Sequence, residues 1–206
     1  MPLIELATVR LKATDPIPPP SFKETWTEAL RGASSAAGIP FHLYRSTTDQ
    51  SVYYLLGGWR AGADHIAFPN TPAALDLAKA IGVFMTVDIV RHISGDIAPL
   101  GPRPQRERLT VSVRKVPVAH AGKWESEWME KGVGGWDESA TVQKQHAAFR
   151  KMGELTNSVE AFGGTDVETF KEWIWVECAT DAFNNEAAGQ SIETETETFE
   201  MEYVIG

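Results

Sequence analysis

The sequence predicts an α+β protein built from two tandem ferredoxin-like units, each with the element order β-α-β-β-α-β. Three observations support this prediction. Strand and helix patterns alternate in that order over the first half, a Pro- and Gly-rich connector lies near the middle, and the second half repeats the pattern about a hundred residues later. The expected boundaries are 1–97 for the first unit, 98–107 for the linker and 108–206 for the second unit.

The chain begins with a strand and a helix. Leucine and β-branched residues are frequent over 3–12, and a proline-rich stretch then prevents the strand from continuing. Ser21 and Glu24 have the spacing of a capping box, in which the serine is the N-cap. Apolar residues then recur at helical intervals until Gly38, where the helix is expected to end.

The remaining elements of the first unit follow the same logic. Residues 39–45 and 52–59 are rich in apolar and aromatic residues and predict two strands joined by a hairpin loop. Thr71, as an N-cap before a proline, predicts the start of a second helix that runs to Gly82. Residues 84–93 predict the fourth strand.

The second half shows the same kinds of segment. Strands are expected over 108–118, 158–168, 170–179 and 196–205, and helical patterns over 123–131 and 139–152. The strongest register between the halves places Trp59 over Cys178 and His65 over Asn184. Because asparagine cannot act as a base, any histidine chemistry is expected in the first half.

Composition excludes several functional classes. With 206 residues and 43% hydrophobic residues the chain can form a substantial core. Its net charge of −9 argues against binding a nucleic-acid backbone. The single cysteine, Cys178, cannot form an internal disulfide, and neither a signal-peptide pattern nor an apolar span of about 18 residues is present. We therefore expect a cytoplasmic protein that binds neither nucleic acid nor membrane.

Short motifs in both halves resemble a known superfamily. Gly58-Trp59 followed by His65-Ile66-Ala67-Phe68, together with GGTDVE (163–168) and KEWIWVE (171–177), is similar to the antibiotic biosynthesis monooxygenase-like, or dimeric α/β barrel, superfamily, and in particular to its fungal tandem-repeat members. The resemblance implies that the two units pair their sheets into a pseudo-dimeric barrel within one chain. Members include cofactor-free monooxygenases, polyketide cyclases, decarboxylases, heme-degrading enzymes and proteins without assigned activity, so the reaction stays open.

Histidines are the main candidates for catalysis. His65 lies at a predicted strand-to-helix junction, where an imidazole that titrates near neutral pH could face the barrel mouth and transfer protons. His92 and His42 are expected to assist it. A structural role for His65, hydrogen-bonded to a nearby carbonyl at the start of a helix, is an equally good interpretation.

Five further residues are candidates for substrate binding: Trp59, Tyr53, Tyr54, Asp88 and Trp136. The aromatic residues could stack on a substrate or donate a hydrogen bond to a developing oxyanion, and core packing is the alternative for the tyrosines. Asp88 and His92 would share one strand face about 13 Å apart and could line a single cavity, or they could lie in solvent at the strand ends. Trp136 follows a glycine-rich loop that could form a lid.

These observations lead to a functional hypothesis. No metal is expected, because the H-x-H, H-E-x-x-H and paired-carboxylate spacings are absent, and no cofactor is expected. We expect an enzyme of natural-product biosynthesis that uses histidine acid–base chemistry to cyclise, dehydrate or decarboxylate an apolar aromatic or polyketide-like molecule. The alternatives are a cofactor-free monooxygenase acting on a phenol or enolate, and a non-catalytic ligand-binding or stress-related protein. A homodimer through the barrel exterior is compatible with each of these.

Overall fold

The computed structural model describes residues 3–12, 17–94, 108–117, 119–120, 122–123, 126, 145–150, 170–178 and 195–206. The predicted α+β class is confirmed. The first half contains β1 (Leu3–Leu11), α1 (Ser21–Ala37), β2 (His42–Ser46), β3 (Val52–Trp59), α2 (Gly62–Ala67), the 3-10 helix η1 (Phe68–Asn70), α3 (Pro72–Phe84) and β4 (Met85–Ser94). The second half contributes β5 (Arg108–Pro117), β6 (Gln145–Arg150), β7 (Phe170–Cys178) and β8 (Glu195–Ile205).

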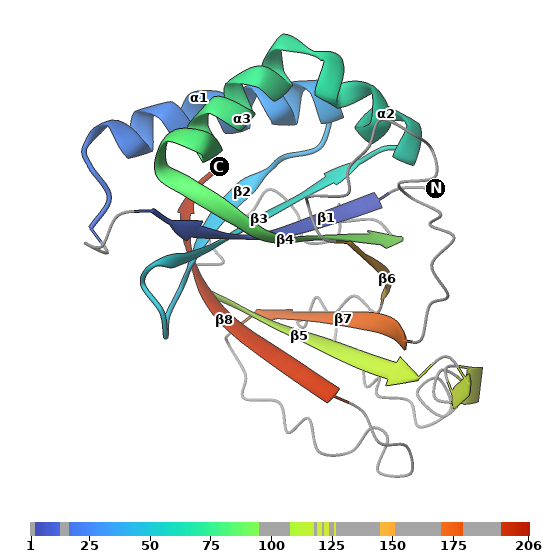
Figure 1. The fold of residues 1–206 in the computed structure, drawn as a ribbon. Coiled ribbons are helices and arrows are strands. Elements are labelled where there is room, and N and C mark those ends of the chain that lie inside the picture. Colours follow the sequence, from blue (N-terminus) through green and yellow to red (C-terminus); the bar gives the residue numbers. More distant parts are fainter. Residues whose placement is uncertain are drawn as a thin grey trace.

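The described strands form one closed barrel in the order β1-β3-β2-β8-β5-β7-β6-β4, with antiparallel neighbours (Figure 1). Read from β4, the order β4-β1-β3-β2 is followed by β8-β5-β7-β6, so the same arrangement of four strands occurs twice. The tandem repeat itself stays a prediction, because much of the second unit, including most of its expected helix at 123–131, lies outside the described residues.

Two local predictions are wrong. The helical pattern at 139–152 contains β6, which pairs with both β4 and β7, so this pairing in the barrel outweighs the local helical periodicity. Ser21 is the first residue of α1 and not its N-cap, because Pro20 already has helical dihedral angles. The strand predicted at 158–168 lies outside the described residues.

Other helix ends follow the predicted signals. Gly38 ends α1 with φ of 68°, a left-handed conformation that glycine adopts without a steric penalty. Thr71 is the N-cap of α3, and its hydroxyl accepts a hydrogen bond of 3.2 Å from the backbone N–H of Ala74. The helix continues two residues beyond the predicted end at Gly82.

Side chains of β1 alternate between two apolar clusters. Ala7 and Val9 pack with residues of α1, such as Trp26, in a cluster between the strands and the helices. Ile4 and Leu6 belong to a second cluster, which also contains β5 and β8 residues from the opposite side of the barrel. The helices α1, α2 and α3 lie together on one side of the strands β1 to β4 (Figure 1), so the first cluster fills the helix-covered face and the second the barrel interior.

A close approach of backbone to side chain occurs at Gly57 in β3. A Cβ atom at this position would lie 2.1 Å from the Phe41 ring, so we expect Gly57→Ala to lower the free energy of unfolding by about 1–3 kcal/mol. Gly82→Ala is the matched control, because nothing lies within 4 Å of the added carbon and alanine favours a helix. Urea titration should show the two substitutions shifting the midpoint in opposite directions. A midpoint for Gly57→Ala equal to that of the native protein would contradict the predicted clash.

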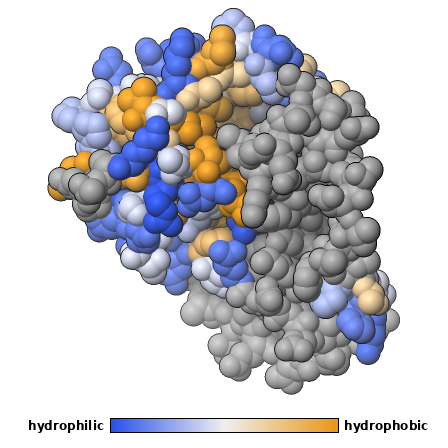
Figure 2. Space-filling view, in the orientation of Figure 1, coloured by the Kyte–Doolittle hydropathy of each residue, from blue (hydrophilic) through white to orange (hydrophobic). Residues whose placement is uncertain are grey.

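The outer surface over the helices is mixed in character. Figure 2 shows hydrophobic side chains there among hydrophilic ones, and Leu75 and Val83 of α3 are more than half exposed. Among the described helices, none combines the length and the apolar character needed to cross a membrane. A homodimer through this exterior stays a prediction.

Candidate active site

A charged residue lies in the otherwise apolar strand β1. Glu5 follows the alternation of this strand and therefore points to the same side as Ala7, toward the helices. It is buried, although carboxylates are seldom buried without partners. The contacts of Glu5 therefore identify a polar centre within the helix-covered face.

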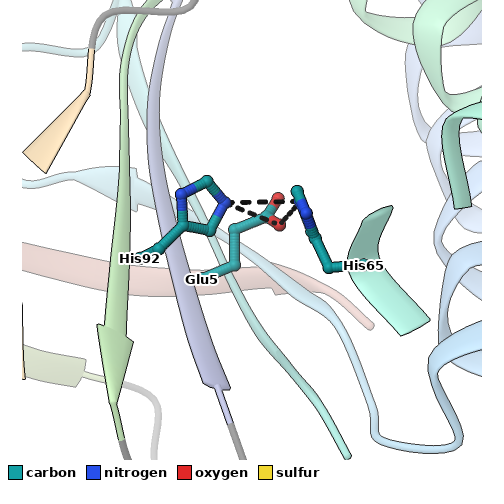
Figure 3. Close-up of side chains that lie close together, drawn as sticks. All are labelled: Glu5, His65 and His92. Carbon is teal, nitrogen blue, oxygen red and sulfur yellow. Dashed lines mark hydrogen bonds and ion pairs between the residues drawn. The ribbon is translucent and has the colours of Figure 1, made fainter. Parts of the chain in front are cut away.

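Two histidines complete this centre. His92 is the β4 residue paired with Glu5 across the sheet, and His65 comes from the short helix α2 (Figure 3). His65 Nε2 lies 2.9 Å from Glu5 Oε2, His92 Nε2 lies 3.6 Å from the same oxygen, and the two Nε2 atoms are 3.3 Å apart. Three residues from separate elements thus bring three polar atoms together.

Trp59, at the end of β3, holds this group in place. Its indole Nε1 donates a hydrogen bond of 2.9 Å to Glu5 Oε2. The indole ring packs edge-on against His65 at 4.9 Å between centroids, and against Phe68 at the same distance. Glu5 Oε2 is therefore oriented by an N–H group, while aromatic rings surround the neighbouring imidazole.

The charge of Glu5 depends on these contacts. Burial alone would raise the pKa of the Glu5 carboxyl, but hydrogen bonds from His65 and His92, with the charges those rings carry when protonated, lower this pKa far below its usual range. Because its pKa is lowered, Glu5 is a carboxylate near neutral pH. A buried negative charge of this kind requires a positive group close by.

The contact between the imidazoles restricts where protons can lie. Two nitrogens 3.3 Å apart can share one N–H, and the adjacent Oε2 can only accept. If both imidazoles were positively charged, they would repel each other at this distance. The simplest arrangement places one mobile proton among the three atoms.

The structure therefore joins two of the three predicted catalytic histidines, while the third lies elsewhere. His42, on β2, packs against Tyr44 and Tyr203, with ring centroids 6.5 and 6.0 Å away. Burial lowers the pKa of His42, whose aromatic neighbours lie on β2 and β8 and not at the Glu5 centre.

The predicted substrate-binding residues are spread over both faces. Trp59 is part of the centre. Tyr53 packs with Phe22 of α1 on the helix-covered face, whereas Tyr54 lies in the barrel interior against Phe199, so core packing accounts for both tyrosines. Trp136 lies outside the described residues.

The expectation that Asp88 and His92 share a strand face that lines the barrel is wrong. The pairing of β4 with β1 shifts by one residue between Thr8 and Val9, so Asp88 lies at a β-bulge. Its carboxylate forms an exposed ion pair with Arg10 at 3.4 Å. His92, beyond the bulge, points to the helix-covered face.

The position expected for His65 is also corrected. It was expected at the barrel mouth, but its ring lies between α2 and the outer face of the sheet, against Trp59. The reason is local: α2 starts shortly after β3 and folds over the sheet face that carries Glu5 and His92 (Figure 3).

A second buried charge lies on the other face of β4. Arg91 points into the barrel interior, where it forms an ion pair of 2.9 Å with Glu197 and lies 5.4 Å from the centre of the Phe199 ring. Neither Glu5 nor Arg91 was singled out from the sequence. The available signal was a charged residue inside an apolar strand, in LIELATV for Glu5 and in FMTVDIVRHI for Arg91.

The fold and this centre define a class: an α+β barrel protein with a buried Glu-His-His group beneath its helical layer. No model of a protein family matches the chain, and no curated protein is similar to it in sequence. Solved structures are similar in fold, and these neighbours include two monooxygenase candidates.

Three of these structures illustrate the similarity. A monooxygenase candidate from Fusobacterium nucleatum has a TM-score of 0.65 at 10% identity, with 98% of this chain and 92% of that chain covered. A second candidate, from Lactobacillus acidophilus, has a TM-score of 0.58 at 9% identity, with 100% and 99% covered. A chlorite dismutase from Candidatus Nitrospira defluvii has a TM-score of 0.57 at 12% identity, with 98% and 90% covered. Identities this low establish a shared fold only.

Proposed function

We propose that the protein is a small-molecule enzyme whose chemistry is proton transfer at the Glu5–His65–His92 centre. The observation that carries this proposal is the contact of one buried carboxylate with two imidazoles. The substrate would be an apolar, aromatic or polyketide-like molecule with an acidic C–H or O–H group. Cyclisation, dehydration and decarboxylation all begin from such a proton transfer, in keeping with a role in natural-product biosynthesis.

Each residue has a distinct part in this scheme. His65 is 9% exposed and His92 only 3%, so His65 is the imidazole that a substrate would approach. Glu5 accepts from His65 Nε2, which fixes the ring and stabilises the positive charge that it gains with the substrate proton. When Nδ1 of His65 takes the substrate proton, the proton on His65 Nε2 can pass to His92 Nε2, which is 3.3 Å away. Trp59 keeps the carboxylate in position.

The second candidate function is a monooxygenase that needs no cofactor, in which the deprotonated substrate reacts with dioxygen. The descriptions of two structural neighbours as monooxygenase candidates favour it. Both candidates require the same first step, removal of a substrate proton by His65. They differ only in whether oxygen is then consumed.

Proton abstraction can be measured before the natural substrate is identified. We expect the native protein to catalyse hydrogen–deuterium exchange at the carbon between the two carbonyl groups in one or more members of a panel of β-dicarbonyl compounds, followed by NMR in D₂O. His65→Ala should reduce this exchange by roughly 10²–10⁴-fold, the usual contribution of a positioned general base. An oxygen electrode on the same mixtures separates the two candidates.

His42→Ala is the matched control, since it removes a half-buried histidine outside the centre. It should exchange at the native rate, and circular dichroism should show both variants folded. Equal rates for His65→Ala and the native protein would remove His65 from the mechanism. Ligand binding without exchange or oxygen uptake would instead favour a non-catalytic binding protein.

The organisation of the chain is a separate part of the proposal. The repeated strand order supports a tandem duplication whose two units together form a pseudo-dimeric barrel. The catalytic centre would then belong to the first unit alone, since its three residues all lie before residue 98. Function in the cytoplasm, as a monomer or as a homodimer, agrees with this scheme.

A further inference from the structure

We infer that Glu5, His65 and His92 form a binding site for one divalent transition-metal ion, with Zn²⁺ as the representative ligand. The site offers one carboxylate oxygen and two imidazole nitrogens. This inference goes beyond the proposed function, which uses the same atoms for a proton and needs no metal. It also reverses the expectation from sequence, because ligands distributed over β1, α2 and β4 leave no spacing motif.

The separations of the three atoms fit a metal ion. A triangle with sides of 2.9, 3.3 and 3.6 Å has its centre about 1.9 Å from each corner. An ion displaced by about 1 Å from this plane would lie ~2.1 Å from all three atoms, the usual length of Zn–N and Zn–O bonds. The angles at the ion would be about 85–115°, which is compatible with three ligands of a distorted tetrahedron with the fourth position open.

The donor set and its charge also favour such an ion. Two imidazoles and one carboxylate are typical ligands of Zn²⁺ and Fe²⁺, whereas Mg²⁺ and Ca²⁺ prefer oxygen ligands. Glu5 is a buried anion, and a divalent cation would supply the positive charge that it requires. The ion would lie among the three atoms, in the place where one shared proton lies when no ion is bound.

The surroundings resemble the support that metal ligands usually have. Trp59 Nε1 donates to the ligating Glu5 Oε2, which orients the carboxylate, and the rings of Trp59 and Phe68 form an apolar wall next to His65. Because β1 and β4 pair directly through Glu5 and His92, the backbone holds two ligands in register. The site is therefore largely formed before an ion binds.

Metal binding and proton transfer exclude each other at these atoms. A neutral imidazole that ligates an ion through Nε2 carries its proton on Nδ1 and cannot accept a second one, so Zn²⁺ should inhibit the deuterium exchange described above. Inhibition would fit both proposals together. Binding without a loss of exchange would support the metal site and contradict the assigned proton-transfer atoms.

The test uses the full chain, freed of metal by a chelator that is then removed by dialysis. Isothermal titration with ZnCl₂ should show binding of one ion per chain. Titration with CoCl₂ should produce the intense visible absorption of a four-coordinate Co²⁺ site, a signal that does not depend on activity.

Substitutions at the site show which residues bind the ion. We expect Glu5→Gln and His92→Ala each to weaken Zn²⁺ binding by at least ~100-fold, and Trp59→Phe, which removes the supporting N–H together with part of the ring, to weaken it by about 10-fold. His42→Ala is the control and should bind like the native protein. Circular dichroism verifies that each variant is folded.

Two results would overturn the metal site: absence of binding by the folded native protein at millimolar Zn²⁺, or equal affinity in the native protein and Glu5→Gln. The first result, combined with exchange activity that His65→Ala removes, would leave the proposed function intact. Tight binding that depends on Glu5, combined with no exchange on any compound of the panel, would support the metal site and count against proton transfer.

Discussion

Replacing Trp26 with alanine should lower the free energy of unfolding by about 3–5 kcal/mol, the range for removing a large aromatic side chain from a core. Trp26 is completely buried in the cluster between α1 and the sheet, and its ring lies 6.0 Å from that of Phe22 one turn earlier. A domain is stable by about 5–15 kcal/mol, so this one substitution would remove a large part of the total. Urea titration followed by circular dichroism measures the change.

Leu75→Ala is the control for this prediction, because it shortens a side chain of α3 that is 60% exposed. Its effect should stay within about 0.5 kcal/mol. If both substitutions cost the same, α1 would not be packed on the sheet as the structure describes. A change in the denaturant slope of Trp26→Ala would indicate a partly unfolded helical layer and not a simple cavity.

The fold of the first unit could be predicted because its signals are local. Residues 52–59 are rich in apolar and aromatic residues and contain a glycine pair near their end, and the structure has β3 at these positions. Thr71 has a side chain suited to capping and a proline next to it, so the start of α3 follows from two neighbouring residues. At 145–150 the local pattern predicts a helix, but the structure has the strand β6. This strand depends on pairing with β4 and β7, which are distant in sequence.

The candidate site could be predicted only in part for the same reason. His65 and His92 were identified by residue type, because histidine is the side chain that titrates near neutral pH. Their contact was not predicted, since it depends on how α2 folds over the sheet. The bulge at Asp88 then reverses the expected orientation of the end of β4, and a shift of one residue moves a side chain to the opposite face. Glu5 was not predicted, because the leucine-rich segment 3–12 indicates a strand but not which partners a charged residue in it would meet.

The second large effect concerns the stability of the centre itself. Glu5→Leu should lower the free energy of unfolding by about 3–5 kcal/mol, because it removes the acceptor for His65 Nε2 and Trp59 Nε1 and leaves these buried groups without it. The measurement is urea titration in the presence of a chelator, so that metal binding adds nothing to the stability of the native protein.

The triple variant Glu5→Leu/His65→Leu/His92→Leu gives the decisive comparison. Replacing a whole buried polar group with apolar side chains of similar size is often neutral or stabilising, whereas breaking it at one member is costly. We therefore expect the triple variant to be about 2 kcal/mol more stable than Glu5→Leu alone, with the lost acceptor for Trp59 as its remaining cost. Additive losses over three single variants would instead mean that these residues act mainly to hold the fold together. With this recovery the triple variant would still be about 1–3 kcal/mol less stable than the native protein, so roughly half of the Glu5→Leu loss would come from leaving the two imidazoles without their carboxylate and not from net stabilisation by the centre.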